Sequence, residues 1–360
     1  SGMISFSKRT AWPQNQNALT QLVEKKKASG ELVVDMTESN PTRCGFSYLN
    51  QQWLEALVNP ANLIYDPDPK GLLDARQAVC RYYASKKISV TPEQIFLTTS
   101  TSEAYHFIFR LLCDPGDRIA VSRPGYPLFD YLAMLNDADI SSYRLKYKNG
   151  WQIDAESLEL VLSQNLKALV VVNPNNPTGH NLDAPEENLI NSFCGHFGTA
   201  IISDEVFLDY CREPFARSLA NNDKVLTFTV SGISKILGLP QMKLSWMVVS
   251  GPKTATQEAV RRLEIIADTY LSVNTPSQRA LSPWLDQAKP AQQEISERLR
   301  VNRKLLADVT QNHPSIKVLE SRAGWYSVLR CGVSDEKAAM ELLSRHNTLV
   351  HPGFYFDFDE

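Results

Sequence analysis

One pattern repeats three times along the middle of the chain, in LKALVVVNPNNPTG at residues 166–179, TAIISDEVF at 199–207 and VLTFTVSGISK at 225–235. In each case an unbroken apolar run is followed at once by turn-forming or polar residues. Such runs are typical of strands that are buried on both faces of a mainly parallel sheet. The pattern therefore predicts an α/β fold, and it directs attention to the residues just beyond each strand.

The alternation of strands and helices extends to both sides of these segments. Apolar residues recur at helical spacing from Leu72 to Tyr82, and a second helical pattern begins near Ala104. Further buried strands are expected in IFLTTS at 95–100, RIAVS at 118–122 and LSWMVVSG at 244–251. We predict a large α/β domain over residues 46–250.

The two ends of the chain have a different character. Residues 1–45 are polar and irregular, so we expect them to form an arm. After residue 250, apolar positions indicate helices around Leu263 and Leu299, followed by the strand-like WYSVLR at 325–330. We predict a smaller α+β domain built from residues 1–45 and 251–360, and we expect its C-terminal end to be incomplete.

Composition limits the classes of partner. The chain has 360 residues, 43% of them hydrophobic, and 37 basic residues against 40 acidic ones give a net charge of -3. That balance provides no field to attract nucleic acid or an anionic membrane, and no apolar run reaches the roughly 18 residues of a membrane helix. Six cysteines lie far apart, without the spacing of a zinc site. We expect free thiols, no metal, a cytoplasmic location and a small polar metabolite as partner.

Five ends of predicted strands carry chemically useful side chains. In open α/β sheets ligands bind beyond the carboxyl ends of the strands, so these residues are the first candidates for a site. They are Thr101 and Ser102, Tyr126 in RPGYP, Asn176 in NPNNPTG, Asp204 in ISDEVF and Lys235 in SGISK.

These motifs, in this order, resemble the fold-type I aminotransferases of class I/II, the aspartate aminotransferase-like enzymes. The resemblance covers most of the chain and rests on a spacing, since Asp204 follows Asn176 by 28 residues and Lys235 follows Asp204 by 31. It implies the fold-type I transferase fold, with a mainly parallel seven-stranded sheet in the large domain. It also implies pyridoxal 5'-phosphate (PLP) as cofactor, an amino acid and a 2-oxo acid as substrates, and a homodimer with shared active sites.

The resemblance implies roles for three residues. Lys235 matches the lysine that forms an aldimine with the cofactor, where an amine of lowered proton affinity acts as nucleophile and proton shuttle. Asp204 matches the aspartate that keeps the pyridine nitrogen protonated, which makes the ring an electron sink. Asn176 matches the asparagine that donates to the phenolic oxygen. Where the family has a tyrosine as second donor to that oxygen, this chain has Phe207.

The resemblance and the local chemistry coincide at one helix start. Thr101 and Ser102 open a predicted helix, whose backbone donors and positive dipole end suit the phosphate of the cofactor. The same stretch fits a capping box of Ser100 and Glu103, which explains these residue types without a ligand. The sequence leaves both explanations open.

Further phosphate contacts are implied near the lysine. The family places an arginine eight residues after the lysine, and this chain has Lys243, which keeps the charge but not the bidentate geometry. Ser231 and Ser234 supply hydroxyl groups, although the family serine more often stands at the position of Gly232. All three side chains are candidate phosphate ligands.

Two tyrosines are implied as well. Tyr126 matches the aromatic residue that stacks on the pyridine ring. Tyr65, in YDPDPKG, resembles the tyrosine that crosses the dimer interface to the phosphate bound by the partner subunit. One subunit alone is then unable to complete a site.

The arginine that binds the substrate carboxylate is missing from the chain. The resemblance places it shortly after HPGFYFDFDE at 351–360, so we expect it beyond Glu360. Ser39, Arg43 and Asn176 are the substrate-facing candidates within the chain. Arg43 is either a substitute for that arginine or an ordinary surface residue.

Three functions fit the motifs. The first is an aminotransferase that works through a Lys235 aldimine. The second is a PLP-dependent C-S lyase, because β-elimination passes through the same carbanion. The third is a non-catalytic PLP-binding sensor, but such proteins normally carry a DNA-binding helical domain in front, and no basic recognition helix is visible here.

Overall fold

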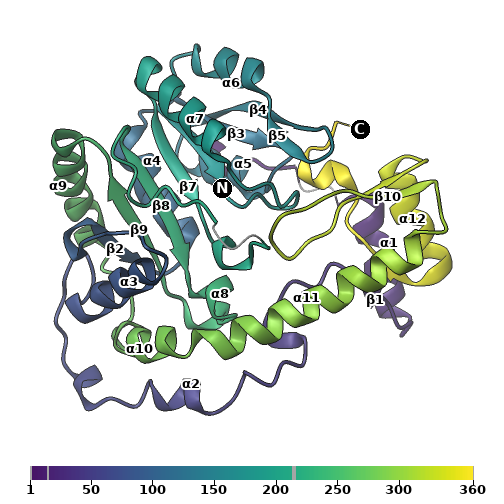
Figure 1. The fold of residues 1–360 in the computed structure, drawn as a ribbon, viewed down its shortest axis with the longest axis horizontal. Helices are drawn as coiled ribbons and strands as arrows, with labels where there is room; N and C mark the ends of the chain where they lie inside the picture. Colours follow the sequence, from purple (N-terminus) through teal and green to yellow (C-terminus); the bar gives the residue numbers. More distant parts are fainter. Residues whose placement is uncertain (1, 14–15, 213–215, 360) are drawn as a thin grey trace.

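The computed structural model describes residues 2–13, 16–212 and 216–359. Its centre is a mixed, mainly parallel sheet of eight strands (Figure 1). In spatial order they are β2 (Ile95–Thr98), β9 (Ser245–Ser250), β8 (Thr227–Gly232), β7 (Ala200–Asp204), β6 (Ala168–Val172), β3 (Arg118–Arg123), β4 (Asp139–Tyr147) and β5 (Trp151–Ile153). Strands β8, β7, β6, β3 and β4 are parallel, whereas β9 and β5 run antiparallel to their neighbours.

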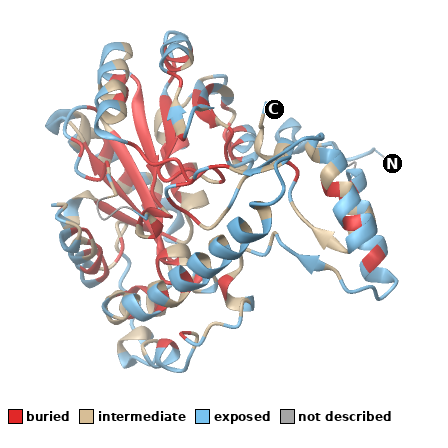
Figure 2. Cartoon of the chain, turned by 45° about the vertical axis from the view of Figure 1, so that its right-hand side comes forward, coloured by how far each residue is buried: buried red, intermediate tan, exposed pale blue. Residues whose placement is uncertain are grey.

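The predicted α/β fold is confirmed, but the sheet has eight strands instead of the expected seven. Strands β4 and β5 form an edge that no apolar run reveals, because several residues of β4 face solvent and β5 is only three residues long. The remaining strands coincide with the predicted apolar runs, since all of them are buried within the sheet (Figure 2).

Helices cover both faces of the sheet. One face packs against α4 (Thr101–Leu112), α5 (Leu128–Leu135) and α9 (Lys253–Tyr270), and the other against α6 (Ala155–Leu162) and α7 (Ala184–Phe197). Alternate residues of each strand serve the two faces: Val170 contacts the first group of helices, and Leu169 and Val171 contact the second. Burial on both faces explains the unbroken apolar runs.

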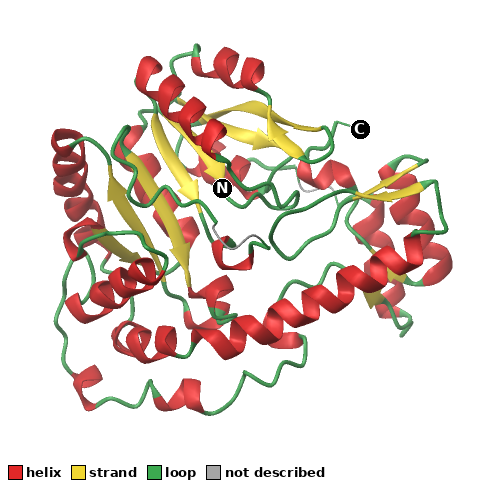
Figure 3. Ribbon diagram, in the orientation of Figure 1, coloured by secondary structure: helices red, strands yellow, loops and turns green. Residues whose placement is uncertain are grey.

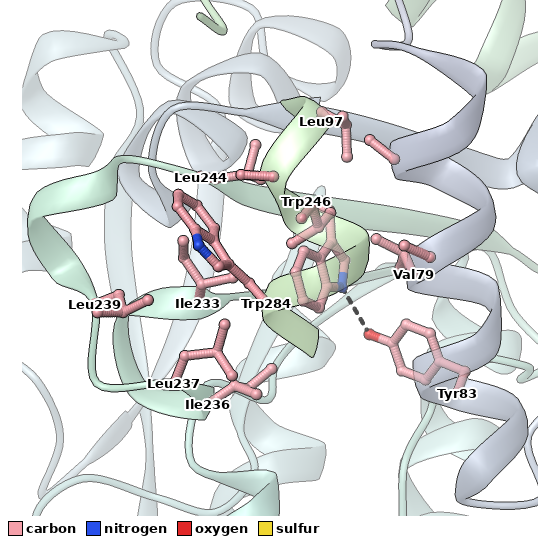
Figure 4. Packing of buried hydrophobic residues seen from close by; sticks show 14 of the residues in the cluster. Val79, Tyr83, Leu97, Ile233, Ile236, Leu237, Leu239, Leu244, Trp246 and Trp284 are labelled. Carbon is pink, nitrogen blue, oxygen red and sulfur yellow. Dashed lines mark hydrogen bonds between the residues drawn. The ribbon is translucent and has the colours of Figure 1, made fainter. Parts of the chain in front are cut away.

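A further buried cluster lies where α3 (Leu73–Ser85) and α10 (Thr275–Asp286) cover β2 and β9 (Figure 4). Trp246 and Trp284 are fully buried in it, and Trp246 Nε1 donates to Tyr83 Oη at 3.1 Å. The cluster also contains Ile233 and Ile236 of the short helix α8 (Ile233–Ile236). Anchoring of α8 in the core holds the lysine between these two residues in place.

The two ends of the chain meet. Helix α1 (Ala18–Ala28) packs on α12 (Asp335–His346) through Leu19, Ala339 and Leu343, and β1 (Val34–Asp35) pairs in parallel with β12 (Thr348–Leu349). The expectation of an irregular arm is therefore wrong. Asn17 caps α1 by accepting from Thr20 N–H. The helix is hard to predict because its apolar face is narrow and three consecutive lysines interrupt the pattern in the sequence.

The segment after residue 250 contributes to more than one part of the molecule. Its long helix α11 (Ala288–Thr310) is largely exposed along its length, yet Ile295 packs in the same cluster as Trp246 (Figure 2). Strands β10 (Ile316–Val318) and β11 (Leu329–Cys331) form a separate antiparallel pair. In the N-terminal part of the chain, the short helix α2 (Gln52–Glu55) precedes α3. The division into domains at residues 46 and 250 stays a prediction.

Candidate functional site

Three predicted site residues lie at one edge of the sheet because their strands are neighbours and parallel. Asp204 is the last residue of β7, Asn176 follows β6, and Lys235 follows β8 by way of α8. The arrowheads of β7 and β8 point toward α8 in Figures 1 and 3. The register pairs Asp204 with Val172 of β6 and Val230 of β8, so the polar loops begin side by side.

Asp204 is buried and held by two donors. Tyr105 Oη donates to Asp204 Oδ2 at 2.7 Å, and the Val206 N–H donates to Oδ1 at 3.3 Å. Burial raises the pKa of Asp204, and these two hydrogen bonds together with the positive charge of Lys235 offset part of that rise. A carboxylate in such a place favours a cationic ligand group, because a nearby positive charge stabilises its ionised form.

The Lys235 amine lies close to two aromatic rings. Its Nζ lies 5.7 Å from the ring centroid of Phe207 and 5.3 Å from that of Trp325, while its backbone carbonyl accepts from Tyr210 Oη at 2.7 Å. Within the described residues, Nζ makes no hydrogen bond or ion pair. Burial lowers the pKa of Lys235, and the charge of Asp204 opposes that effect. A lowered pKa increases the share of neutral amine, which is the form that acts in nucleophilic attack and proton transfer.

The loop after β6 contains three asparagines, and their hydrogen bonds separate one from the others. Asn173 donates to Arg217 O at 2.7 Å and accepts from Leu182 N. Asn175 accepts from Thr178 Oγ1 at 2.7 Å and donates to a serine. Asn176 Oδ1 is buried and has no hydrogen-bond partner among the described residues. Asn173 and Asn175 therefore shape the loop, and Asn176 keeps an amide group available for a ligand.

The start of α4 is capped by its own residues, and phosphate binding there stays a prediction. Ser100 Oγ accepts from Glu103 N–H at 3.1 Å, and Glu103 Oε1 accepts from the N–H of Thr99 at 3.0 Å, so the helix is capped by its own residues. Thr101 and Ser102 are half-buried in the first turn, and neither side chain has a hydrogen bond within the described residues. Their hydroxyl groups are thus not required by the cap.

The remaining phosphate candidates differ in their surroundings. Ser231 is fully buried and donates to the Glu205 carbonyl at 3.4 Å, whereas Ser234 is half-buried. Lys243 is exposed, in the left-handed region with φ of 53°. Close packing explains the glycine at position 232, because an added Cβ would lie 2.9 Å from Ser245 Cα of the adjacent strand. A serine is therefore excluded from the position where the family more often has one.

Tyr126 lies in the loop between β3 and α5 and is 43% exposed. Its ring meets that of Phe129 edge-on, with centroids 6.4 Å apart. Burial raises the pKa of Tyr126, and the neighbouring Tyr326 and Asp204 add to the rise. The influence of Asp204 indicates that Tyr126 belongs to the same part of the molecule as the carboxylate.

Three other candidates make no contact with Lys235 or Asp204 within the described residues of one chain. Tyr65 is 77% exposed just after the 3-10 helix Pro60–Leu63. Arg43 is exposed at the end of the 3-10 helix Pro41–Arg43, and Ser39 is half-buried just before it.

The structure adds site residues that the sequence did not indicate. Tyr105 contacts Asp204, and Trp325 packs edge-on against Phe207 with ring centroids 5.3 Å apart. A signal for Tyr105 existed, because it follows Ser102 by three residues and thus lies on the same face of α4. No local signal marks Trp325, which comes from a distant segment.

Among the residues that the structure describes, no group of three or more His, Cys, Asp or Glu side chains is arranged to hold a metal ion. No helix in the same part of the chain has the length and apolar character needed to cross a membrane.

Comparison with known proteins gives a consistent result. The model of the family "Aminotransferase class I and II" matches residues 43–360. The glutamate-pyruvate aminotransferase AlaA of Haemophilus influenzae is 26% identical over 344 residues, which cover 91% of this chain and 84% of that protein. The S-alkyl-thiohydroximate lyase of Arabidopsis thaliana is 30% identical over 223 residues, covering 61% and 48%.

Solved structures have the same fold. The alanine aminotransferase from Pyrococcus furiosus superposes with a TM-score of 0.86 at 24% identity, and the match covers 98% of this chain and 92% of that one. A likeness at this level of identity concerns the fold, and it agrees with the arrangement of sheet and helices described above.

Proposed function

This chain belongs to the class I and II aminotransferases, a family that uses pyridoxal phosphate, and we propose that its amino-group transfer depends on Lys235. One arrangement carries the proposal. The Lys235 amine, whose pKa burial lowers, lies at the same edge of the sheet as the buried Asp204 carboxylate and the side-chain amide of Asn176.

The available groups fit the cofactor in chemistry. Pyridoxal phosphate has a basic ring nitrogen, a phenolic oxygen, an aldehyde and a phosphate, for which we assign Asp204, Asn176, Lys235 and the start of α4 with Thr101 and Ser102, respectively. Asn176 supports this assignment through its amide nitrogen, because Nδ2 has no hydrogen-bond acceptor within the described residues and is free to donate to the phenolic oxygen.

The chemistry divides between the cofactor and the chain. When bound, pyridoxal phosphate supplies an electron sink that acidifies the hydrogen on the α-carbon of an amino acid. Lys235 Nζ takes up that proton and later gives it up to the cofactor. Its lowered pKa leaves more neutral amine near pH 7, which is the form that accepts a proton. Asp204 holds the proton of the ring nitrogen. Phe207 and Trp325 limit the access of water to Nζ.

Further cofactor contacts are proposed from Tyr126, Ser234 and Lys243. Tyr126 has an exposed ring beside the site, and Lys243 supplies a positive charge without an ion pair among the described residues. Ser231 is the weakest member of this group, since its hydroxyl already donates to the Glu205 carbonyl. It would have to give up that bond to reach a phosphate.

We propose that the enzyme is a homodimer with shared active sites. Leu63, Ile64 and Tyr65 are consecutive residues that are 91%, 62% and 77% exposed, which is costly for a monomer in water. A second copy that covers this segment buries its apolar surface and brings Tyr65 toward the partner's phosphate site. The site of one chain is incomplete without that residue.

We propose a cytoplasmic location on the composition of the chain. Six widely spaced cysteines suit a reducing compartment. Fractionation of cells that produce the protein, with antibodies against markers of each compartment, tests the location directly.

Substrate choice is tested by a half-reaction screen. We propose alanine and glutamate as the first donors to try, because relatives are named for these reactions. Each of the twenty amino acids is added to the cofactor-loaded protein without a 2-oxo acid, and the visible absorbance of the cofactor is followed. Loss of the band identifies donors, and a band that no amino acid changes would refute amino-group transfer.

The same screen tests whether Arg43 or Ser39 takes part in substrate binding. Substitution of a residue that binds the substrate carboxylate raises KM for every amino acid, because all of them share that group. We expect this result for Arg43→Gln if Arg43 binds the substrate carboxylate. An unchanged KM makes Arg43 an ordinary surface residue.

A second activity, C-S lyase, has one specific observation in its favour. The relative from Arabidopsis thaliana is named as a lyase and shares 30% identity over 223 residues, although these cover only 48% of its length. Release of pyruvate and ammonia from a cysteine-like substrate, without a 2-oxo acid acceptor, would show β-elimination. Amino-group transfer alone gives neither product from that substrate.

A further inference from the structure

The Asp204 carboxylate has a neighbour that the assigned chemistry does not use. Tyr105 is 3% exposed, and its hydroxyl donates to Asp204 Oδ2 at 2.7 Å. Its ring is fixed by Phe129, with centroids 5.1 Å apart at 77°, and by Phe109 at 5.9 Å. The phenol therefore has one well-defined position, and its polar end meets the carboxylate.

Tyr105 also stays a donor under all working conditions. Burial raises the pKa of Tyr105 well above its usual value, and the negative charge of Asp204 adds to that rise. The hydroxyl therefore stays neutral and donates its proton to Asp204. Without such donors, burial would favour the protonated form of the Asp204 carboxyl group. A hydrogen bond to a charged group is stronger than one between neutral groups.

Helix α4 joins this contact to the opposite end of the proposed cofactor site. Tyr105 follows Thr101 by four residues and Ser102 by three, so the three side chains lie on one face of the helix. The first turn carries the proposed phosphate ligands, and the second turn carries the phenol on Asp204. One rigid element thereby sets the spacing between the two proposed contacts.

We propose that Tyr105 is a positioning residue, whose hydroxyl holds the Asp204 carboxylate ionised and correctly oriented for the ring nitrogen of the cofactor. The inference rests on the proposed function, because it assumes that Asp204 faces that nitrogen. Tyr105 acts through Asp204 and touches neither the substrate nor the reacting atoms.

The test compares two cofactors on the full-length protein. Apoenzyme is reconstituted with pyridoxal phosphate or with its 1-deaza analogue, in which C–H replaces the ring nitrogen, and Kd is measured for each. The variants are Tyr105→Phe, Asp204→Asn and a matched control, Tyr143→Phe. Tyr143 is also fully buried, but its hydroxyl donates to the Val170 carbonyl at 3.0 Å.

We expect Tyr105→Phe to raise Kd for pyridoxal phosphate by about tenfold, as the loss of a charge-assisted hydrogen bond predicts. Its Kd for the deaza analogue should stay within about twofold of the wild-type value, because that ligand has no nitrogen for Asp204 to hold. Tyr143→Phe should change neither value, although both phenylalanine variants should melt slightly below the wild type.

Different failures have different meanings. Equal weakening of both cofactors by Tyr105→Phe, or no weakening of either, would overturn the role of Tyr105, because the ring nitrogen would then not sense the phenol. If wild-type protein binds both cofactors equally and Asp204→Asn changes nothing, the assignment of Asp204 fails instead. The two outcomes are distinguishable in one set of titrations.

Discussion

The adjacent carboxyl groups of Asp204 and Glu205 are both buried, but their different partners suit them to different roles. Asp204 lies near a lysine, whereas Glu205 is buried with only neutral donors, the Leu219 N–H at 2.8 Å and Ser218 Oγ at 2.8 Å. Burial raises the pKa of Glu205 to about 8. Asp204 is thus suited to bind a cation, and Glu205 serves to fasten the segment around Leu219 to the end of β7.

The raised pKa of Glu205 predicts a pH-dependent stability. Between its usual value of 4.5 and about 8, the folded protein keeps a proton that the unfolded chain has released. The free energy of unfolding should therefore fall as pH rises through this window. Glu205→Gln removes the titration, so its melting temperature should change less between pH 5 and pH 9 than that of the wild type, by calorimetry.

The control for this experiment is Asp223→Asn, since Asp223 is exposed and, within the described residues, pairs with the exposed Lys224 alone. Its melting curve should follow the wild type across the pH range. If the Glu205→Gln curve runs parallel to that of the wild type as well, Glu205 is ionised in the folded protein and the account of its burial is wrong.

Single residues were predictable where chemistry follows directly on a strand. Lys235, Asp204 and Asn176 stand at the ends of buried apolar runs, which makes them visible in the sequence. The spacing places Tyr105 on the same helix face as Ser102, but its contact with Asp204 depends on packing between α4 and the end of β7. Trp325 comes from a distant segment, so no local spacing indicates its contact with Phe207. The roles of the site residues stay predictions.

At the scale of elements, the turn after β6 depends on a contact with the C-terminal segment. Gly179 closes NPNNPTG with φ of 69°, and an added Cβ would overlap Ser321 Oγ and the Ala323 carbonyl. Gly198, at the end of α7, has nearly the same φ of 68° but open space around it. Substitution of Gly179 and of Gly198 therefore distinguishes the cost of steric overlap from the cost of backbone strain, because both positions share the strain.

Gly179→Ala should therefore cost about 3 kcal/mol or more of unfolding free energy, against about 1 kcal/mol for Gly198→Ala. Urea titration measures both values. Gly179→Ala should also lower cofactor content, because the backbone shift that relieves the overlap moves Asn176. Equal losses in the two variants would mean that the turn adapts freely and does not position Asn176.

Elements were predicted well where they are buried on two faces and poorly elsewhere. Strands β6, β7 and β8 coincide with apolar runs, whereas β4 has an exposed pattern and β5 is three residues long. Helix α1 leaves a weak pattern in the sequence because its few apolar residues pack against the distant C-terminal segment, including α12. Contacts that are remote in the sequence leave weak local patterns.

At the scale of the whole molecule, the shared site predicts complementation between inactive variants. Tyr65→Ala and Lys235→Ala should each have strongly reduced activity, because each lacks one group of the composite site. After mixing, unfolding and refolding together, half of the dimers should carry one intact site, which restores about a quarter of wild-type activity.

The control mixes Lys235→Ala with Asp204→Ala. These two residues lie in the same chain at adjacent strand ends, so no mixed dimer regains an intact site. Recovery in the control mixture, or its absence in the mixture of Tyr65→Ala with Lys235→Ala, would contradict the shared site. Size-exclusion chromatography with light scattering confirms that the mixed species are dimers.

Covalent attachment of the cofactor to one lysine can be located directly. Cofactor-loaded protein is reduced with borohydride, digested and analysed by mass spectrometry, alongside Lys235→Ala and, as control, Lys224→Ala at an exposed lysine outside the proposed site. We expect a phosphopyridoxyl group on the peptide with Lys235 in the wild type and in Lys224→Ala, and none in Lys235→Ala. Labelling of a different lysine, or wild-type protein that takes up no cofactor, would contradict this expectation.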